Sequence, residues 1–526
     1  MSFLNLGPED FNINEIVIVG GGTAGWLTAS VLAAHFDTKT KFNIQLIESP
    51  NIKTVGVGEG TWPTMAATLR QIGVSEAQFI SECDASFKQG SRFMNWSHGK
   101  GEKYYHPFSL PIGYTDINIV DHWLESGLGV PFDQFSTLQT GVCDHFLAPK
   151  QPTTPEYANV VNYGYHLNAG KFATLLKNHS VNKLGVKHIS SEVTEVSSDG
   201  KGIIQSVTLD DGTKIKGDLF IDCTGFKRLL IGQHLGVTFK SYIDVLFNDR
   251  AMAFQVPYQD ENAAINSTTH ATAHKNGWIW DISLPSRKGI GIVYSSAYGD
   301  EQGAHDTVEA YIKEQMPHIN IADLTPNKIS IDPGHLDTFW KGNCVAVGLS
   351  AGFVDPLEAT AMVLIELSAK FLKDHLPIAK GDMDTIAKKF NQRMDLHWKN
   401  IIDFIKLHYV LSERTDSDYW LSHRDPSTIP ESLQRSLSIW KNRSPWHPDV
   451  EFAESLFPPS SYQYILYGMG FKSKTGLANK RSADRERKYV EDLLNKKQAE
   501  LHKLCQHLPT NRKLLSDIKR SWNNRL

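Results

Sequence analysis

The sequence of 526 residues predicts an α/β fold, in which a parallel sheet with its helices is interleaved with an antiparallel sheet and followed by a helical C-terminus. Three observations predict it. A strand, a glycine-rich turn, a helix and a second strand open the chain, hydrophobic residues alternate in 247–296, and leucines recur seven residues apart near the end. The length exceeds that of one simple domain, so two or three lobes around a large core are expected.

The first predicted element is a buried strand of β-branched residues that leads into Gly20, Gly22 and Gly25 at G-x-G-x-x-G spacing. A helix follows, and a second strand at 42–47 ends at Glu48. The first glycine allows a tight turn, the second lets the backbone approach a pyrophosphate, and the third lets helix and strand pack closely. The helix N-terminus favours negative charge, and Glu48 can accept hydrogen bonds from a ribose 2′-OH. The pattern predicts dinucleotide binding, and the alternative is a glycine-rich turn in an ordinary α/β domain.

FAD is favoured over NAD as the dinucleotide because the glycine motif opens the chain and other segments are typical of flavoproteins. The strand at 219–225 ends in Asp222, Thr224 and Gly225, and it resembles the second FAD-contacting strand of flavoproteins with two dinucleotide-type domains. A second glycine-rich loop at 55–61 either lies flat against a planar ring or simply turns the chain. The residues expected at the cofactor are Gly20, Gly22, Thr23, Ala24, Gly25, Glu48, Val193, Asp222, Gly225, Leu349 and Met362.

Residues 66–94 are expected to be mostly helical. Lys88 lies on this stretch between Phe87 and Phe93. A lysine among aromatic residues usually packs its stem on apolar surface and keeps its ammonium group in water. A functional role for Lys88 is the alternative.

The segment 99–150 is rich in aromatic residues, histidine, glycine and proline, with weak periodicity. Its sequence YYHPF, at 104–108, can form the wall of a pocket for an aromatic ligand or a packed loop. The regular elements expected next are a helix at 165–176, strands at 186–189, 193–196 and 204–209, and a hairpin turn at 210–212.

The alternating segment 247–296 predicts an antiparallel sheet in which Trp278 and Trp280 share one face of a strand. Two tryptophans on one face are more often core than functional, but their large rings can also plug a cavity. A buried strand at 344–347 then leads through a glycine-rich turn to a helix that begins near Ala359. Glu358 lies at this helix start, where a negative charge is favourable, so its role can be purely structural.

The C-terminal region is expected to be helical and, from Lys472 onward, basic. Its seven-residue leucine spacing is broken by Pro509, which favours a hairpin of two helices over a coiled coil. The basic excess indicates a solvated face, with membrane-surface binding as the alternative.

Composition excludes several classes of protein. A formal net charge of −4 gives no reason to expect nucleic acid as a partner. Five scattered cysteines without a C-x-x-C pair argue for a reducing compartment and against a disulfide framework or a zinc site, so no metal is expected. We find neither a signal-peptide pattern nor an apolar run as long as a membrane span, and we expect a cytoplasmic protein.

Taken together, these segments resemble the flavin-dependent halogenases of the tryptophan halogenase family, from about residue 14 to about residue 475. Two of the family's motifs are altered here, because Ser283 in GWIWDIS replaces a proline and PLEATA differs at Ala359 and Ala361 from the usual P-L-E-S-T-G. The matching segments are GGGTAGW at 20–26, ASFKQGSRFMNW with Lys88 at the family's lysine position, HPF at 106–108, GWIWDIS, PLEATA at 356–361 and YILYGMGF at 464–471.

The resemblance implies an FAD-binding Rossmann-like domain of the glutathione-reductase and aromatic-hydroxylase type, interleaved with a substrate domain of antiparallel sheet and helices. The strands of the two domains alternate along the chain, without a long linker. The predicted FAD-binding domain is 14–75, 155–240 and 330–380, the substrate-binding domain is 76–154, 241–329 and 381–475, and the C-terminal helical extension is 476–526.

The resemblance also implies a reaction. Reduced FAD, O₂ and chloride or bromide would give hypohalous acid, which would pass through the interior to Lys88. Its ammonium would hydrogen-bond the acid, or a neutral amine of depressed pKa would form a haloamine. Glu358 would stabilise the cationic intermediate of the aromatic ring and help remove its proton. Because no second glycine fingerprint is evident, a separate flavin reductase would supply the reduced FAD.

Other residues would have supporting roles. Trp278 and Trp280 would keep the organic substrate off the flavin. The halide would lie against the backbone N–H groups of Thr360 and Ala361, at a helix start. The altered residues Ala359 and Ala361 would affect proton transfer or the position of Lys88, and the preference for one halide.

His106, Phe108 and Phe457 would contact the substrate. Leu456 and Phe457 stand where tryptophan-specific members have a Phe-Trp pair, and the tyrosine–glutamate clamp of those members is not evident. We therefore expect an electron-rich, indole-like aromatic substrate, with tryptophan as one candidate, and the sequence allows a homodimer. The alternatives are an FAD-dependent aromatic monooxygenase and a non-catalytic protein that binds FAD or a metabolite.

Overall fold

A computed structural model describes residues 13–52, 58–126, 129–376, 379–449, 454–477 and 480–524. One sheet of six strands is parallel except at one edge, where β20 runs against β21. Its central strands are buried runs of β-branched and apolar residues, as predicted for the opening strand and for those near 219 and 344. In order across the sheet the strands are β20 (Trp340–Lys341), β21 (Cys344–Ala346), β12 (Leu219–Asp222), β1 (Glu15–Val19), β2 (Asn43–Glu48) and β8 (Lys187–Ser190).

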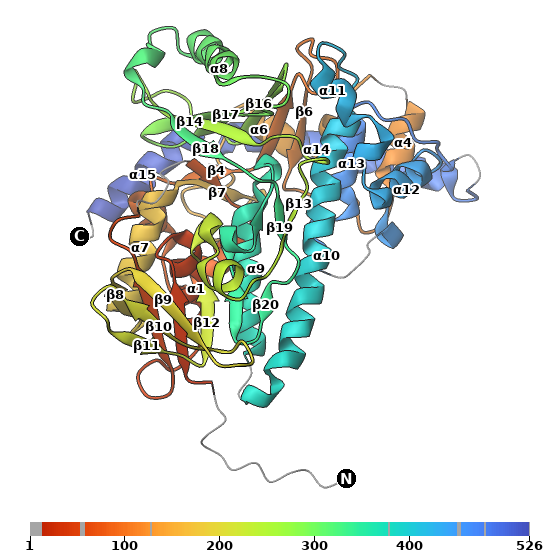
Figure 1. Ribbon diagram of the computed structural model, residues 1–526. Coiled ribbons are helices and arrows are strands. Elements are labelled where there is room, and N and C mark those ends of the chain that lie inside the picture. Colours follow the sequence, from red (N-terminus) through yellow and green to blue (C-terminus); the bar gives the residue numbers. More distant parts are fainter. Residues whose placement is uncertain are drawn as a thin grey trace.

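Beside this sheet, helix α1 (Thr23–Ala33) packs against both α7 (Ala169–Asn182) and α9 (Thr360–His375). A small antiparallel sheet lies next to it in Figure 1, formed by β9 (Val193–Ser198), β10 (Ile204–Leu209) and β11 (Lys214–Lys216). The turn between β10 and β11 contains the predicted Asp210–Gly212 segment. This part of the molecule has the Rossmann-like arrangement that the sequence predicts.

The second large sheet has seven strands and is antiparallel except where β15 and β5 run parallel. One of its faces is covered by α8 (Glu301–Gln315), whose Val308 and Ile312 pack against Phe254 and Ile292 (Figure 1). In order the strands are β18 (Asn327–Ser330), β14 (Arg250–Pro257), β17 (Arg287–Tyr294), β16 (Gly277–Ser283), β15 (Thr269–His274), β5 (Gly90–Met94) and β6 (Lys103–Pro107). The predicted antiparallel sheet in 247–296 is confirmed.

Two small sheets connect these layers. One has the order β13 (Phe239–Ser241), β19 (Gly334–Leu336) and β22 (Gly352–Phe353). The other has the order β3 (Gly58–Gly60), β7 (Gly164–Asn168) and β4 (Ser86–Lys88), so β3 and β4 are edge strands. Of the predicted glycine-rich loop 55–61, residues 55–57 lie outside the described residues.

Two predictions of local structure are wrong. Residues 66–94 contain only the short helices α2 (Thr64–Ile72) and α3 (Glu76–Glu82), and strands β4 and β5 follow, so Lys88 lies on a strand. The predicted helix at 165–176 begins only at Ala169, after strand β7. In both cases buried apolar and aromatic side chains occur in short runs, which fit either a helix or a strand until tertiary pairing decides.

The remaining helices lie beside the sheets. The longest, α10 (Met383–Val410), extends from the upper to the lower part of the molecule in Figure 1. The others before the C-terminal hairpin are α4 (Ile119–Ser126), α5 (Phe132–Ser136), α6 (Gln139–Asp144), α11 (Asp418–His423), α12 (Glu431–Trp440) and α13 (Pro459–Gly468).

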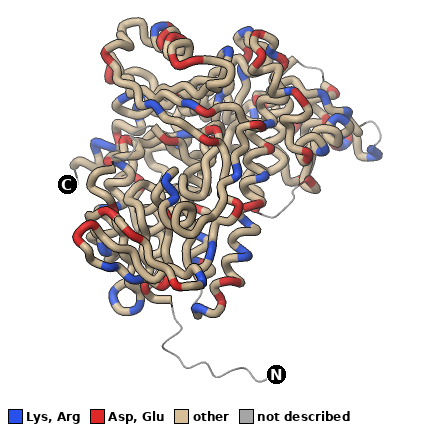
Figure 2. The backbone as a smooth tube through the Cα atoms, viewed as in Figure 1, with Lys and Arg blue, Asp and Glu red and all other residues tan. Residues whose placement is uncertain are grey.

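The predicted C-terminal hairpin is present as α14 (Ala483–His507) and α15 (Asn511–Asn523). Its basic residues are accompanied by acids: Arg487 pairs with Glu125 and Asp484, and Lys513 pairs with Asp517. Figure 2 shows the two signs of charge distributed together over the molecule.

Candidate active site

The glycine turn between β1 and α1 is shaped by close backbone approaches. A Cβ atom added at Gly20, whose φ is +118°, would lie 2.2 Å from the carbonyl oxygen of Cys223. A Cβ atom added at Gly25 would lie 1.9 Å from the carbonyl oxygen of Gly20. At Gly22, by contrast, an added Cβ meets nothing within 4 Å, and Gly22 caps α1 without a side-chain hydrogen bond. The first N–H groups of α1, near Thr23 and Ala24, therefore face open space, which suits an anion.

Glu48 lies beside this turn, because a Cβ added at Gly21 would meet the Glu48 side chain. Its Oε2 is paired with Lys177 at 2.8 Å and with His188 at 2.9 Å. An acid at the end of β2 and an uncapped helix start are what a dinucleotide needs, so the residues present fit FAD.

The other residues predicted at the cofactor differ in their surroundings. The Asp222 carboxylate accepts hydrogen bonds from Thr224, Leu230, Ile231 and Ser350, so it organises its own turn. Gly225 faces open space, and Leu349, which is 37% exposed, follows Gly348, where an added Cβ would meet Ala24. Val193 is half-buried on β9 and Met362 is buried in α9.

Lys88 is 1% exposed, contrary to the usual behaviour of a surface lysine. Its Nζ lies 5.5 Å from the centroid of the Phe108 ring, and 3.0 Å from the position of a Cβ added at Gly60. Nζ has neither a hydrogen bond nor an ion pair within the described ranges. Burial lowers the pKa of Lys88 to about 8, although the charges of Glu358 and Glu59 oppose this shift. The site thus holds an amine with a pKa of about 8 that has no hydrogen-bonding or ionic partner among the described residues.

Glu358 lies in the turn Leu357–Ala359 that precedes α9, one residue further from the helix than predicted. Glu358 and Ala359 have φ angles of +69° and +54°, and two consecutive residues other than glycine in this region indicate a strained backbone that the surroundings hold in place. A Cβ atom added at Gly60 would lie 3.3 Å from Ala359 Cβ in this turn, and it is the same atom that would lie close to Lys88 Nζ. Lys88 and the Glu358 turn therefore meet at Gly60.

Two histidines hold the Glu358 carboxylate. Its Oε1 lies 2.8 Å from His106 Nδ1 and 3.3 Å from His408 Nε2, and all three side chains are buried. Burial raises the pKa of Glu358, but the charge of His106 and the hydrogen bonds from both histidines outweigh burial and hold it well below its usual range. The carboxylate is therefore ionised at neutral pH.

The second nitrogens of these histidines are also engaged. His106 Nε2 lies 3.0 Å from Ser461 Oγ, and His408 Nδ1 lies 2.9 Å from the carbonyl oxygen of Phe404. The carbonyl can only accept, so His408 Nδ1 is the donor there. His106, which is predicted to contact the substrate, is bonded here to Glu358 and Ser461.

Aromatic rings surround this group. Phe457 stacks on Phe404 with ring centroids 3.7 Å apart, and it meets Trp62 edge-on at 5.1 Å. The Trp62 indole N–H donates to the carbonyl oxygen of Glu358. His106 lies 5.7 Å from Phe404. Phe108 thus lies by the amine, and Phe457 packs against Trp62 and Phe404, two rings that neighbour the carboxylate turn and His106.

The two tryptophans of β16 are neighbours, with ring centroids 6.3 Å apart. Trp280 lies flat against Gly291 on β17, where an added Cβ would be 1.9 Å from the ring. The Trp278 indole N–H donates to buried Asp355, which also accepts from Asn248, Tyr409 and the backbone N–H of Leu357. Asp355 therefore connects Trp278 to the turn that carries Glu358.

Thr360 and Ala361 form the first turn of α9, and Ala359 caps this helix without a side-chain hydrogen bond. The helix is sixteen residues long, and its first turn contains no acidic residue. Free N–H groups at such a start can receive an anion.

Sequence reasoning missed His408, Ser461, Asp355 and Glu59. Glu59 lies on β3, and burial raises its pKa to about 7 against the charge of Lys88. His408 lies in the last turn of α10 and Ser461 in a proline-rich segment, where neither residue carries a motif. Only Asp355 and Glu59 stand inside glycine-rich turns that the sequence marks as unusual.

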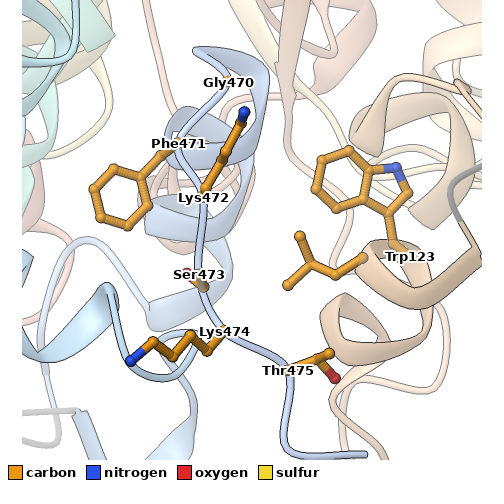
Figure 3. A pocket seen from close by; sticks show the side chains of 8 residues that line it. Trp123, Gly470, Phe471, Lys472, Ser473, Lys474 and Thr475 are labelled. Atoms are coloured by element: carbon orange, nitrogen blue, oxygen red, sulfur yellow. The ribbon is translucent and has the colours of Figure 1, made fainter.

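A separate groove of about 560 Å³ lies at the C-terminal end of α13 (Figure 3). It is lined by Trp123, Leu124 and 470–475. Lys472 and Lys474 are exposed residues of the irregular segment that follows α13. None of the residues of the Lys88 and Glu358 group lines it.

The model of the tryptophan halogenase family matches residues 15–483. A tryptophan halogenase from Shewanella frigidimarina has a crystal structure similar to this one, with a TM-score of 0.92, 46% identity, and coverage of 97% of this chain and 98% of that one. Tryptophan 6-halogenase SttH from Streptomyces toxytricini is 35% identical over 483 residues, 87% of this chain and 90% of its own length. The structure of Tar14, a tryptophan C-6 flavin-dependent halogenase (chlorinase) from taromycin biosynthesis, gives a TM-score of 0.89 at 33% identity, with coverage of 96% and 100%.

Among the described residues, no helix combines the length and the apolar character that a membrane span requires. The match extends from the glycine turn to the start of α14 and includes every residue of the amine and carboxylate group. The chain belongs to the tryptophan halogenase family and is a flavin-dependent halogenase, an enzyme that uses reduced FAD and a halide ion.

Proposed function

We propose that Lys88 and Glu358 are the catalytic residues and that this enzyme halogenates an electron-rich, indole-like aromatic with chloride or bromide. One observation supports this most directly. The buried Lys88 amine, which has no hydrogen-bond or ion-pair partner among the described residues, and the turn that carries Glu358 both lie against Gly60. Two histidines hold the Glu358 carboxylate ionised. Such pairs of titratable groups in opposite environments are typical of acid–base sites.

The cofactor would be held by the N–H groups of α1 and the backbone at Gly20, Gly22 and Gly25, with Glu48 at the ribose. When bound, reduced FAD together with O₂ and the halide supplies hypohalous acid. Thr360 and Ala361 would receive the halide at the start of α9. Trp278 and Trp280 would exclude the organic substrate from the flavin.

The pKa of about 8 leaves Lys88 mainly as an ammonium at neutral pH. We therefore favour the ammonium, rather than the neutral amine, as the group that binds hypohalous acid. Its N–H would donate to the acid's oxygen and make the halogen more electrophilic. The ammonium has no competing acceptor among the described residues, so the incoming acid would take this hydrogen bond.

Glu358 would stabilise the cation that forms when the halogen adds to the aromatic ring, and would then accept the proton that the ring releases. His106 and His408 would keep the carboxylate ionised and fixed. Phe108, Phe457 and the edge of His106 would bind the aromatic ring.

Three relatives carry tryptophan in their names, and tryptophan is one candidate here. Beyond the two histidines, the rings of Trp62, Phe404 and Phe457 pack near Glu358, which favours the aromatic part of a substrate over its charged part. We therefore propose an indole-like substrate as the class, with free tryptophan as one member to be tested.

Flavin-dependent halogenases need a separate flavin reductase, and we propose that this chain takes reduced FAD from one. Five free cysteines support a cytoplasmic location. We also propose a homodimer, and a division into an FAD-binding domain (14–75, 155–240, 330–380), a substrate-binding domain (76–154, 241–329, 381–475) and a C-terminal extension (476–526). The interleaved sheets support this division.

The test combines purified protein, a flavin reductase, O₂ and either halide with a library of aromatic compounds, followed by mass spectrometry. We expect products with the isotope pattern of chlorine or bromine. Lys88→Ala should abolish them and leave FAD affinity unchanged. A product that gains one oxygen without halogen would instead support an aromatic monooxygenase, and the absence of any product with either halide would support a binding protein.

A further inference from the structure

The strand that carries Lys88 is short and lies at the edge of its sheet. Strand β4 has three residues and, among the strands that the structure describes, pairs only with β7. Tyr165, opposite Phe87 on β7, uses both its backbone groups on Thr61 at the other side. The backbone groups of Phe87, the residue before Lys88, therefore point to the open edge and have no backbone partner on β7.

The C-terminal hairpin closes this edge. Asn511, the first residue of α15, is fully buried, and its Nδ2 donates to the carbonyl oxygen of Phe87 at 3.2 Å. Its backbone N–H donates to the carbonyl oxygen of Phe146 at 2.8 Å. In Figure 1, α15 lies next to β4 and β7, and α15 contacts both β4 and α3.

Gln89, which follows Lys88, is connected to the start of α15 as well. Gln89 Nε2 donates to the carbonyl oxygen of Leu147 at 2.8 Å, and Leu147 forms a β-bridge with Thr510. Arg512 donates to the carbonyl oxygens of Ala263 and Pro285, which places the hairpin against two connections between strands of the large sheet as well. Both neighbours of Lys88 are thus connected, directly or through one residue, to 510–512.

Only one end of the Asn511 side-chain amide is hydrogen-bonded. Its Oδ1 is buried and has no hydrogen-bond partner among the described residues. Burying an amide with only one end satisfied is unfavourable, so an apolar residue of similar size would suit the packing of α15 equally well. The contact that distinguishes asparagine here is the one to Phe87.

We infer that Asn511 is a positioning residue for Lys88, and that the C-terminal hairpin, most of which lies beyond the part matched by the family model, is part of the catalytic architecture. The hairpin holds the edge of β4 so that the Lys88 amine stays in its buried position beside Gly60. This inference rests on the proposed role of Lys88.

The test compares Asn511→Leu, which removes the donor at similar size, with Lys513→Ala, an exposed position on the same helix that pairs only with Asp517. Misplacing a catalytic group by about 1 Å can cost about a hundredfold in rate, so we expect kcat to fall at least about tenfold in Asn511→Leu, with FAD affinity as in the control. In Asn511→Leu, more hypohalous acid should escape from the enzyme into solution, and its amount is measured by trapping with monochlorodimedone.

A third readout separates positioning from general destabilisation. The groups that face the Lys88 amine are Glu358, Glu59 on β3 and His166 on β7. If the amine leaves its buried position, the inflection of the rate near pH 8 should move upward, toward the ordinary lysine value. The Lys513→Ala control should keep the inflection of the parent enzyme.

The inference is overturned if Asn511→Leu keeps the kcat, the inflection and the low escape of hypohalous acid seen in the control, while Lys88→Ala is inactive. If Lys88→Ala itself retains activity, the proposed catalytic role of Lys88 is wrong, and the result does not bear on the contact between Asn511 and Phe87. Should leucine prevent folding, Asn511→Ala removes the same donor without added bulk and is judged by the same three measurements.

Discussion

At Lys88, burial and two carboxylates act on one amine in opposite directions. Burial lowers its pKa, and the charges of Glu358 and Glu59 raise it, with a net value of about 8. The same pocket therefore keeps the group charged at neutral pH and close to its titration point. Small changes in its surroundings should then alter the reaction measurably.

The first prediction concerns pH. If the ammonium is the active form, the rate of halogenation should be level between pH 6.5 and 7.5 and fall about tenfold per unit well above pH 8. Product formation at saturating reduced FAD measures this. In Lys88→Arg, whose guanidinium stays charged, the fall should disappear at a lower overall rate. An unchanged fall in that variant would assign the inflection to another group.

Ala359 provides the second prediction, because it lies against the same point at Gly60 as the Lys88 amine. In Ala359→Ser the hydroxyl would give the ammonium an acceptor. A hydrogen bond to a charged group contributes about 1.5 kcal/mol, and one pKa unit corresponds to about 1.4 kcal/mol, so the inflection should move up by about one pH unit. The pH–rate profile measures it, and an inflection that stays near pH 8 would show that the hydroxyl points elsewhere.

At this scale the sequence motifs singled out Lys88, Glu358 and His106, because each stands in a segment with a recognisable pattern. They did not indicate His408 or Ser461, which come from α10 and α13. A histidine beside apolar residues near the end of a helix is usually a core residue, and only the fold brings His408 to within 3.3 Å of the Glu358 carboxylate.

At the scale of secondary-structure elements, Gly291 on β17 leaves the space that the Trp280 ring on β16 occupies. The Trp280 ring lies flat on Gly291, and Trp278 is fixed by its hydrogen bond to Asp355. The two rings occupy one layer because the side-chain period of a strand is two.

The third prediction uses this contact. Gly291→Ala would place a Cβ 1.9 Å from the Trp280 ring, so the ring must move, at a cost of about 1–3 kcal/mol in the free energy of unfolding. We expect less halogenated product per reduced FAD consumed, because the barrier between flavin and substrate is disturbed. Gly289→Ala, where an added Cβ makes only ordinary contacts from 3.4 Å, is the control. Equal coupling in both variants would contradict the barrier role.

Elements with strict alternation or with glycine and proline boundaries were predictable, such as β1, β16, β17 and the C-terminal hairpin. The stretch 66–94 was not, because its short apolar runs fit helix and strand equally. Strand β4 forms only through pairing with β7, about eighty residues later, and through the contact with Asn511.

Across the whole molecule, buried polar contacts hold together segments that are far apart in sequence. Glu76 on α3 pairs with Lys150 at 2.6 Å and accepts hydrogen bonds from Tyr163 and Tyr165. Tyr165 belongs to β7, the strand between β3 and β4. The network therefore supports the small sheet that carries Lys88.

The fourth prediction removes the cation of this network. Lys150→Met would leave the Glu76 carboxylate buried without its partner, which costs about 3–5 kcal/mol in the free energy of unfolding. Urea unfolding measures the loss. Lys328→Met, which breaks a pair with Glu301 in which both side chains are more than half exposed, should change stability by about 1 kcal/mol or less. Similar losses in the two variants would show that burial of the Glu76 pair is unimportant.

By itself the sequence determined the dinucleotide turn and the family, and it singled out Lys88 and Glu358 as candidate residues, because these depend on residues adjacent in the chain. Only the tertiary structure decided that Lys88 lies on an edge strand, that two histidines hold Glu358, and that a residue at position 511 supports the strand that carries Lys88. The reason is physical: spacing along the chain determines local turns and helix starts, whereas burial, pKa and strand pairing depend on neighbours that the fold brings from hundreds of residues away.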